Sequence, residues 1–478
     1  MAKEGNIKTG KQEHGFWNFI DRIEGDKVVW IIVFMLTMIS ALAIFSSTSQ
    51  LAGGSKDRID LIREHALFIA IGYALIWGIY KIRSIKVIRI ASRYGFLLSF
   101  VLLLILDCHL NLGFIKAAYI NKAWRTLSLF GFQIHVFEVV KVSMVMYLAW
   151  ALHSYRQDCE AMERNKKSPT FATANWLGKF ESFRFMTEPK WKRIMYLYIP
   201  VIVTTVMVKP GSNSSMVLIG GISILILLIG RMPFREIALI IASGVAALGI
   251  CMGLNLASDG RIFRNMRFEE LLRRFEVDYS IERLIDIENN PELGKKCKEW
   301  YDVRDEIRQP YSARIAIHEG GLFGKLSGNS TQKYVVAHIY SDYMFSFIVE
   351  EYGLFGGIII LMLFVSLLAR GSFIAKLCQN DFAKYAVGGL SLLISGQAFL
   401  HIFVNVDIGP MTGQTLPMIS DGSFAFLMFC VAFGIILSIS KMARNQIREQ
   451  EEAAAPLYAS TKDDIQAAMD VLEQIDNQ

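Results

Sequence analysis

Long uninterrupted apolar segments recur along the whole chain, and they limit its fold more than any other feature. Each has about 18 residues or more, enough for a helix to cross a hydrocarbon core of about 30 Å. The segments are continuous rather than alternating, so they predict membrane-spanning helices and not the strands of a membrane barrel. With 53% hydrophobic residues in 478 and a mean hydropathy of +0.36, the chain is too apolar for a soluble protein of this size.

We therefore predict an all-α polytopic membrane protein with about ten transmembrane helices. The first apolar segment is preceded by a long polar region and followed by many spans, so we interpret it as a retained helix rather than a cleaved signal peptide. The predicted spans are 28–46, 66–82, 94–112, 136–152, 194–208, 214–230, 236–254, 343–369, 385–405 and 415–440.

Basic residues predict the orientation of these helices, because Lys and Arg concentrate in cytoplasmic loops. The ten predicted spans place every basic connection on the same side as both termini. The chain then divides into a cytoplasmic N-terminal segment (1–27), a membrane domain (28–440) and a cytoplasmic tail (441–478). The basic segments are 81–89, 153–193, 231–235, 369–376 and 441–448.

The remaining long loop, about 255–342 between the seventh and eighth helices, is then extracytoplasmic. Within it, residues 267–287 have helical apolar spacing and are expected to lie along the membrane surface. In the tail, a capping signal at Thr461 precedes an apolar stripe, which favours either a partner-binding helix or a marginal surface helix.

Several classes of function lack any signal in this chain. The net charge of +6 follows the membrane topology, and no basic-aromatic patch indicates nucleic-acid binding. The six cysteines are scattered without metal-ligand or redox spacing. There is no nucleotide-binding motif, so energy-coupled pumping by this chain alone has no support.

Three acids in the stretch AHIYSDYMFSFIVEEYG (337–353) are the first candidates for chemistry, because carboxylates in or beside lipid are costly. A helix beginning near Tyr343 puts Asp342 at its wet outer end, where the helix dipole favours an anion. Glu350 lies about 12 Å deeper and about 80° around the helix, so it is able to line the same cavity. Glu351 points elsewhere. For both glutamates, ion pairs that only support helix packing are an equal alternative.

Two further groups of polar residues lie on predicted spans. His135, Glu138 and Lys141 are spaced i, i+3, i+6 near the outer end of the fourth span, where Glu138 and Lys141 can pair. The pair is either structural or holds a phosphate through the lysine. His401 and Asn405 belong to a polar stripe on the ninth span, and such stripes often serve only as hydrogen-bonded contacts between helices.

The segment HEGGLFGKLSGNSTQK (318–333) precedes Asp342 in the same loop. Its glycine-rich backbone, with Lys325 and Lys333, suits phosphate binding, although a glycine-rich turn has the same composition. Together these residues predict an outward-facing cavity that holds an acid and several bases. A transporter with proton or ion relays and an enzyme with Asp342 as general base both fit such a cavity.

Three of these segments, in their order along the chain, resemble the SEDS family (shape, elongation, division and sporulation), and its FtsW branch most closely. GGLFGKLSGNSTQK resembles the family's GGLFGKGLGNSxQK. AHIYSDYMFSFIVEEYGLFGG resembles its EAHTDFIFAIIGEELGLxG. GQAFLHIFVNVDIGPMTGQTLPMISDGS resembles its GQAFINIxVNxGLLPTxGxTLPLISYGGS. The resemblance covers most of residues 28–440.

The resemblance implies a peptidoglycan glycosyltransferase that polymerises lipid II at the outer face of the cytoplasmic (inner) membrane, at the division septum. It implies a class B penicillin-binding protein and other division proteins as partners. Asp342 corresponds to the family's essential acid and would be the general base. Glu138 and Lys141 match the Glu and Lys of its QPSEFxK segment, and Arg125 matches the second arginine of its RRW segment. Arg63 joins this group through REHALFIAIG, which resembles KRQLIFLLIG but has Glu64 in place of the family's arginine.

The chain also departs from the family pattern. Phe137 replaces a serine, Gly211 replaces an acid, His401 replaces an asparagine and Asp421 stands where tyrosine is common. A lipid-linked-sugar flippase and a non-catalytic scaffold that recruits a penicillin-binding protein remain the alternatives. No cofactor is indicated with certainty, but the sequence leaves open a divalent cation, Mg²⁺ or Mn²⁺, shared by Asp342 and Glu138.

Overall fold

The computed structural model confirms a predominantly helical protein and describes most of the chain. Each of the ten predicted spans overlaps a helical segment among the described residues, although 94–112 and 415–440 extend beyond theirs. The described residues are 24–47, 58–110, 115–120, 123–129, 132–164, 170–257, 277–289, 298–336, 339–409 and 412–476.

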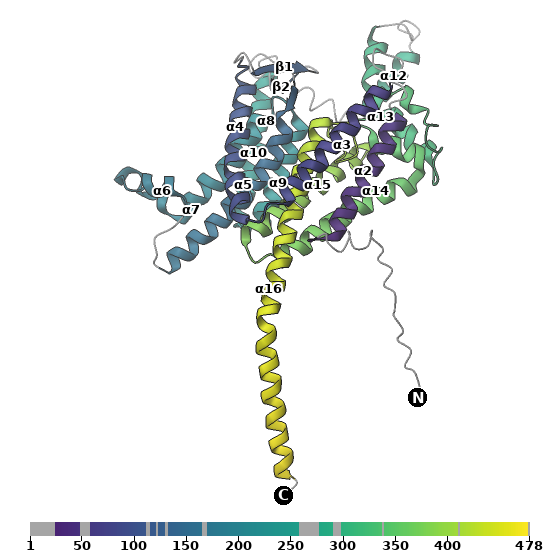
Figure 1. The fold of residues 1–478 in the computed structure, drawn as a ribbon. Coiled ribbons are helices and arrows are strands. Elements are labelled where there is room, and N and C mark those ends of the chain that lie inside the picture. Colours follow the sequence, from purple (N-terminus) through teal and green to yellow (C-terminus); the bar gives the residue numbers. More distant parts are fainter. Residues whose placement is uncertain are drawn as a thin grey trace, which may run out of the picture.

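The helices form one bundle from which a single long helix projects (Figure 1). Among the described residues, eight helical segments are long and apolar enough to cross a membrane, and α9 is a shorter apolar helix. The helices are α2 (Lys27–Ser47), α3 (Arg58–Tyr80), α4 (Ile85–Asp107), α5 (Val136–Glu163), α6 (Ala172–Leu177), α7 (Pro189–Arg193), α8 (Ile199–Val208), α9 (Asn213–Ile229), α10 (Phe234–Ala257), α12 (Val277–Asn289), α13 (Lys298–Gly320), α14 (Met344–Leu377), α15 (Asp381–Asn405) and α16 (Ser423–Asp476). Short 3₁₀ or π-helical turns are η2 (Glu181–Thr187), η3 (Ile194–Tyr198) and η5 (Gln332–Tyr334).

Helix α5 lies at the centre of the bundle and is its most enclosed spanning helix. It packs against α4, α9 and α15, while α14 packs against α15 and α16 against α3. Most buried positions of α5 are apolar, whereas α4 leaves residues such as Ile90 and Leu97 exposed, as expected of a helix that faces lipid. The residues that α5 carries at its first turns are therefore held by packing on several sides.

A small antiparallel sheet leads into α5 and was not expected from the sequence. It has the order β1 (Ile115–Ile120), β2 (Ala123–Leu129) and β3 (Phe132–His135). Thr126 on β2 pairs with His135, the last residue of β3 and the residue before α5. The sheet and the long loop with α12 and α13 mark one end of the bundle, here called the sheet end (Figure 1).

The opposite end, from which α16 extends, is here called the tail end (Figure 1). Asp26 is buried there and caps α2 by accepting from the backbone N–H groups of Val28 and Val29 at 3.0 and 3.2 Å. Its carboxylate also pairs with Arg370 of α14 and Arg444 of α16, so the start of α2 is tied to both of these helices at this end.

The last span begins later than the sequence predicts, at Ser423 instead of about 415. Pro417 lacks a backbone N–H and Met418 has a φ of 63°, so the residues before Ser423 form an irregular segment. That segment contributes to the candidate site. At its other end α16 continues without a break through 440 into the predicted tail.

Some predicted features lie wholly or partly outside the described residues. They include residues 1–23 of the N-terminal segment and 258–276 of the outer loop. The predicted surface helix at 267–287 is described from Val277 onward, as α12. The backbone of the tail helix is described, but the side chains of its predicted apolar stripe are not.

Candidate active site

A pocket at the sheet end brings together residues that are far apart in the sequence. Its volume is about 270 Å³. The walls come from β2, the start of α5, the start of α9, the segment before α14 and the irregular segment before α16. The lining residues are Arg125, Thr126, His135, Phe137, Glu138, Ser212, Ser215, Ser341, Asp342, Gly413, Gln414, Thr415, Asp421, Gly422 and Ala425.

Asp342 lies two residues before α14, as the sequence predicts, and it lines this pocket. Ser341 Oγ donates to Asp342 Oδ1 at 3.1 Å. The backbone is fixed from behind, because Asn405 Nδ2 donates to the carbonyl of Asp342 at 3.3 Å and Asn405 Oδ1 accepts from the N–H of Ser346 at 3.0 Å. These hydrogen bonds of Asn405 hold the backbone that carries the Asp342 carboxylate at the start of α14.

Glu138 lines the same pocket, and Lys141 lies directly behind it. The ammonium of Lys141 is 2.6 Å from Glu138 Oε1, and its side chain is almost completely buried. The same ammonium donates to Gln397 Oε1 at 2.8 Å and to Gln414 Oε1 at 3.2 Å. Lys141 therefore joins α5, α15 and the segment before α16, and it orients Glu138 and Gln414 rather than lining the pocket itself.

His401 and Asn405 form the layer behind the pocket. The carbonyl of Gln414 can only accept, so His401 Nδ1 donates to it, at 2.7 Å. Its Nε2 then accepts from the N–H of Phe345 at 3.4 Å. Both ring nitrogens are engaged in the pattern of a neutral imidazole. Neither residue lines the pocket, and their contacts instead hold the start of α14 against the Gln414 segment.

Arg125 brings positive charge to the pocket from β2. Its Nε donates to the carbonyl of Gly211 at 3.1 Å. Gly211 has no room for a side chain, since an added Cβ would lie 2.2 Å from Phe137 Cζ and 2.7 Å from the carbonyl oxygen of Trp124. The ring of Phe137 thus fills the space that a side chain at position 211 would take, and both residues are departures from the family pattern.

Burial and neighbouring charges shift the pKa values of two residues near the pocket, His135 in its lining and Tyr340 just before Ser341. Loss of solvation lowers the pKa of His135, and the charges of Arg125 and Lys141 lower it further against the opposing effect of Glu138. Burial raises the pKa of Tyr340, with added effects from the carboxylates of Asp421 and Asp342. A neutral His135 and a neutral Tyr340 are therefore expected at pH 7, near a pocket lined by the three carboxylates Glu138, Asp342 and Asp421.

Sequence reasoning did not assign Gln414, Asp421, Ser215 or Ser341 to the site. Gln414 and Asp421 fall in the segment GQTLPMISDGS, which contributed only to the resemblance, and Asp421 stood out solely as a departure. Within one sequence no periodicity marks these residues, because the segment between α15 and α16 is irregular.

Glu350 and Glu351 lie in a different cluster, away from the pocket lining. Oxygen atoms of Glu350 accept from Ser330 Oγ at 2.5 Å, from the N–H of Thr331 at 2.8 Å and from Lys325 Nζ at 3.0 Å. Glu351 Oε1 accepts from Ser46 Oγ at 2.5 Å and from the N–H of Gly328 at 2.9 Å.

Glu350 and Glu351 both accept hydrogen bonds from the glycine-rich segment 319–333, here called the glycine loop. Lys325 also pairs with Glu319, and Lys333 Nζ donates to the carbonyl of Gly328 at 2.7 Å. Lys325 and Lys333 are thus occupied within the loop and do not line the Asp342 pocket. The expectation that Glu350 shares this pocket rested on helix geometry alone, and the loop covers that face of α14.

Arg63 also lies apart from the pocket, exposed on α3. As for a metal, the described residues contain no group of three or more His, Cys, Asp or Glu side chains placed to hold an ion. A cation shared by Asp342 and Glu138 remains a prediction. The pocket thus unites Asp342, Glu138 and Arg125 directly, and Lys141, His401 and Asn405 through supporting contacts.

Known proteins resemble this chain over nearly its whole length. The family model for FtsW, RodA and SpoVE, described as cell cycle protein, matches residues 26–445. A "Probable peptidoglycan glycosyltransferase FtsW" of Coxiella burnetii is 24% identical over 423 residues, which are 87% of this chain and 96% of the relative. The corresponding protein of Enterococcus hirae is 26% identical over 433 residues, 89% of this chain and 94% of the relative.

One solved structure shares the fold. It is described as "Structural coordination of polymerization and crosslinking by a peptidoglycan synthase complex", and its similar chain matches with a TM-score of 0.57 at 16% identity. The match covers 88% of this chain and 98% of the other.

Proposed function

This chain belongs to the FtsW, RodA and SpoVE family of cell cycle proteins, and from this membership and its sheet-end pocket we propose that it is a peptidoglycan glycosyltransferase of the inner membrane. Its relatives of nearly equal length carry that activity in their names. The observation that carries the proposal is the meeting of Asp342, Glu138 and Arg125 in one pocket.

We infer that the substrate is lipid II, a disaccharide-pentapeptide on undecaprenyl diphosphate. Asp342 takes the proton of the acceptor sugar's 4-hydroxyl as that oxygen attacks the anomeric carbon of the donor. The bond from this carbon to the diphosphate breaks, and undecaprenyl diphosphate leaves. Arg125 lies where positive charge can stabilise the departing anion, and Lys141 holds Glu138 in place.

The orientation that serves this reaction places the sheet end outside and both termini in the cytoplasm. Basic residues at the tail end support it, because Arg370, Arg444 and Lys441 all lie near the start of α2. Such a polymerase produces glycan strands that need crosslinking. We therefore propose a class B penicillin-binding protein as its partner, together with other division proteins at the septum.

Polymerisation of lipid II by the purified full-length chain, with and without its partner, tests the proposal. The wild-type protein should yield glycan strands, and Asp342→Asn should yield none because an amide cannot take the proton. Asp407→Asn is a matched control, since Asp407 pairs with Arg314, does not line the pocket, and has a φ of 64° that asparagine tolerates.

Undiminished polymerisation by Asp342→Asn would rule out the general-base role. Translocation of lipid II across proteoliposomes without polymerisation would instead indicate a flippase. Recruitment of the partner with neither activity would indicate a scaffold.

A further inference from the structure

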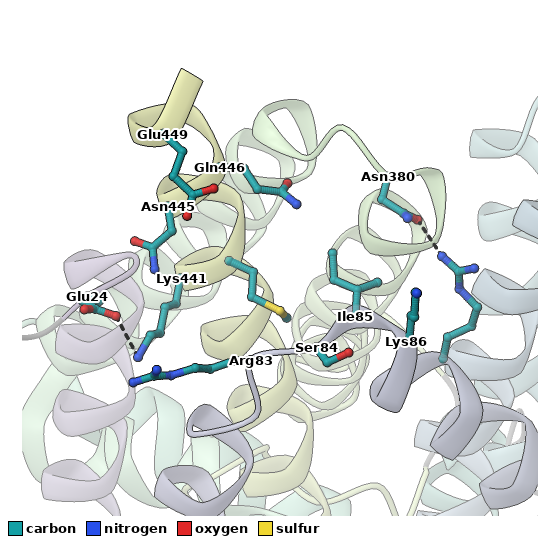
Figure 2. Close-up of a pocket in the computed structure, with 12 residues that line it drawn as sticks. Glu24, Arg83, Ser84, Ile85, Lys86, Asn380, Lys441, Asn445, Gln446 and Glu449 are labelled. Carbon is teal, nitrogen blue, oxygen red and sulfur yellow. Dashed lines mark hydrogen bonds and ion pairs between the residues drawn. The ribbon is translucent and has the colours of Figure 1, made fainter. Parts of the chain in front are cut away.

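A second cavity opens at the tail end, on the opposite side of the bundle from the Asp342 pocket, and nothing in the proposed reaction uses it. Its volume is about 740 Å³. Figure 2 shows Arg83, Ser84 and Lys86 on one side and Asn445 and Glu449 of α16 on the other. The lining residues are Glu24, Arg83, Ser84, Ile85, Lys86, Arg89, Asn380, Lys441, Met442, Asn445, Gln446 and Glu449.

The charge of this tail-end pocket favours an anion. Four cations line it against two carboxylates. One carboxylate is matched, because Lys441 Nζ lies 2.7 Å from Glu24 Oε2 and its hydrogen bond lowers the pKa of Glu24. Among the described residues, Arg83 and Lys86 have no ion-pair partner. Positive charge therefore remains in excess at the α4 side.

Donor groups in the pocket also lack full partners. Arg89 makes one long hydrogen bond, 3.4 Å to Asn380 Oδ1, and its buried Nε has no acceptor. Ser84 precedes α4 in the capping position, yet its hydroxyl caps no backbone N–H. Ser84, Ile85 and Lys86, at the start of this 23-residue helix, thus line a cavity together with its cations. Backbone donors and Arg or Lys side chains in this arrangement are suited to phosphate.

An apolar surface begins at the rim of this pocket. From Val87 onward, α4 exposes Ile90, Tyr94 and Leu97, which lie three or four residues apart and share one helix face. A soluble anion has no apolar part that could contact this surface. A lipid would place its phosphate in the pocket and its acyl chains along this face, and basic pockets between membrane helices bind such headgroups.

We propose that the tail-end pocket binds the phosphate headgroup of an anionic membrane lipid, with the acyl chains lying along α4. In the proposed orientation this lipid belongs to the cytoplasmic leaflet. The site is separate from the polymerisation pocket, so the proposal stands or falls independently of the glycosyltransferase activity.

Thermal unfolding of the full-length protein in detergent tests this proposal. Titration with diphosphatidylglycerol should raise the melting midpoint of the wild type, whereas phosphatidylcholine should not. In the double variant Arg83→Gln/Lys86→Gln the apparent dissociation constant for diphosphatidylglycerol should rise roughly thirtyfold, as expected for loss of two cations at an anionic headgroup. Both side chains are exposed, so the lipid-free melting midpoint should stay near that of the wild type.

The matched control is Arg235→Gln/Lys376→Gln, which removes the same two residue types from exposed positions outside the pocket. This variant should bind the lipid like the wild type. Equal lipid affinity in the wild type and the Arg83→Gln/Lys86→Gln variant would overturn the site. Inorganic diphosphate at matched ionic strength should produce no shift, and an equal shift with diphosphate would overturn the lipid as the ligand.

Discussion

Individual residues in the sheet-end pocket show how the chain departs from its family without losing the pocket. The ring of Phe137, where the family has serine, fills the space beside Gly211, where the family often has an acid. Arg125 Nε donates a hydrogen bond to the backbone carbonyl of Gly211. We interpret the two departures as a compensating pair that keeps Arg125 at the pocket wall.

This pairing predicts non-additive effects of substitution. Gly211→Ala should destabilise the protein by about 1–3 kcal/mol, because its Cβ would overlap the Phe137 ring and the backbone oxygen of Trp124. In a Phe137→Ala background the loss should be smaller, since only the backbone contact remains. Melting midpoints of the wild type, both single variants and the double variant measure the coupling. Strictly additive changes would show that the two residues are independent.

The sequence predicted some of the residues that line the pocket and missed others. Asp342, Glu138 and Arg125 could be placed because each adjoins a predicted helix or a family motif, and a carboxylate near lipid draws attention by its cost. Gln414 and Asp421 could not, because they lie in an irregular segment where no periodicity applies. Their positions depend on contacts with Lys141 and Tyr340 that only the folded chain reveals.

Helix α14 departs from the continuous helix that the sequence predicts. Its backbone leaves helical geometry at Gly353, with φ 70° and ψ −175°. Backbone N–H groups of Lys325 and Leu326 donate to the carbonyls of Glu350 and Glu351 at 2.9 and 2.8 Å, replacing bonds that a continuous helix would make. The glycine loop therefore completes a broken helix, as irregular backbone at membrane depth requires.

This arrangement predicts a structural role for Glu350. Glu350→Gln should lower stability by about 3 kcal/mol, since it removes the buried charge that pairs with Lys325 and accepts from Ser330 and Thr331. Polymerisation per folded molecule should remain near the wild-type rate. Melting midpoints and activity normalised to folded protein measure the two effects.

Glu319→Gln is the control, because Glu319 also pairs with Lys325 but is exposed. Its effect on stability should be small. A Glu350→Gln variant that melts like the wild type but makes no glycan would assign Glu350 to the chemistry instead.

The helices and the sheet differ in how well the sequence predicted them. Uninterrupted apolar segments are a strong signal, and each predicted span overlaps a helical segment, although the residues before Ser423 are irregular. The strands β1 to β3 are only four to seven residues long and pair with each other. Their alternation of apolar and polar residues is therefore a much weaker signal than the long apolar spans.

For the whole molecule, the two pockets give the ends of the bundle different roles. The sheet end holds Asp342, Glu138 and Arg125, and the tail end holds Arg83 and Lys86, which form no ion pair within the described part of the chain. Both roles depend on the same orientation in the membrane. An independent measurement of that orientation therefore bears on each.

Thiol labelling measures it without reference to activity. Cys108 is exposed and directly follows α4, which starts at the tail-end pocket and runs toward the sheet. With Cys378 retained and the other four cysteines replaced by serine, Cys108 should react with a membrane-impermeant maleimide in intact spheroplasts. A second variant, Cys108→Ser with Lys376→Cys, places the thiol at an exposed position near the end of α14. It should react only after the membrane is opened.

Cys378 provides an internal check on this experiment, because it lies two residues from that site but is buried. Burial raises the pKa of its thiol to about 11, so almost none is thiolate at pH 7.5 and it should stay unlabelled in the native protein even when the membrane is open. Labelling of Cys108 only after opening, together with labelling of Lys376→Cys in intact spheroplasts, would invert the orientation. The Asp342 pocket would then face the cytoplasm, where a polymerase of outer-surface glycan could not work.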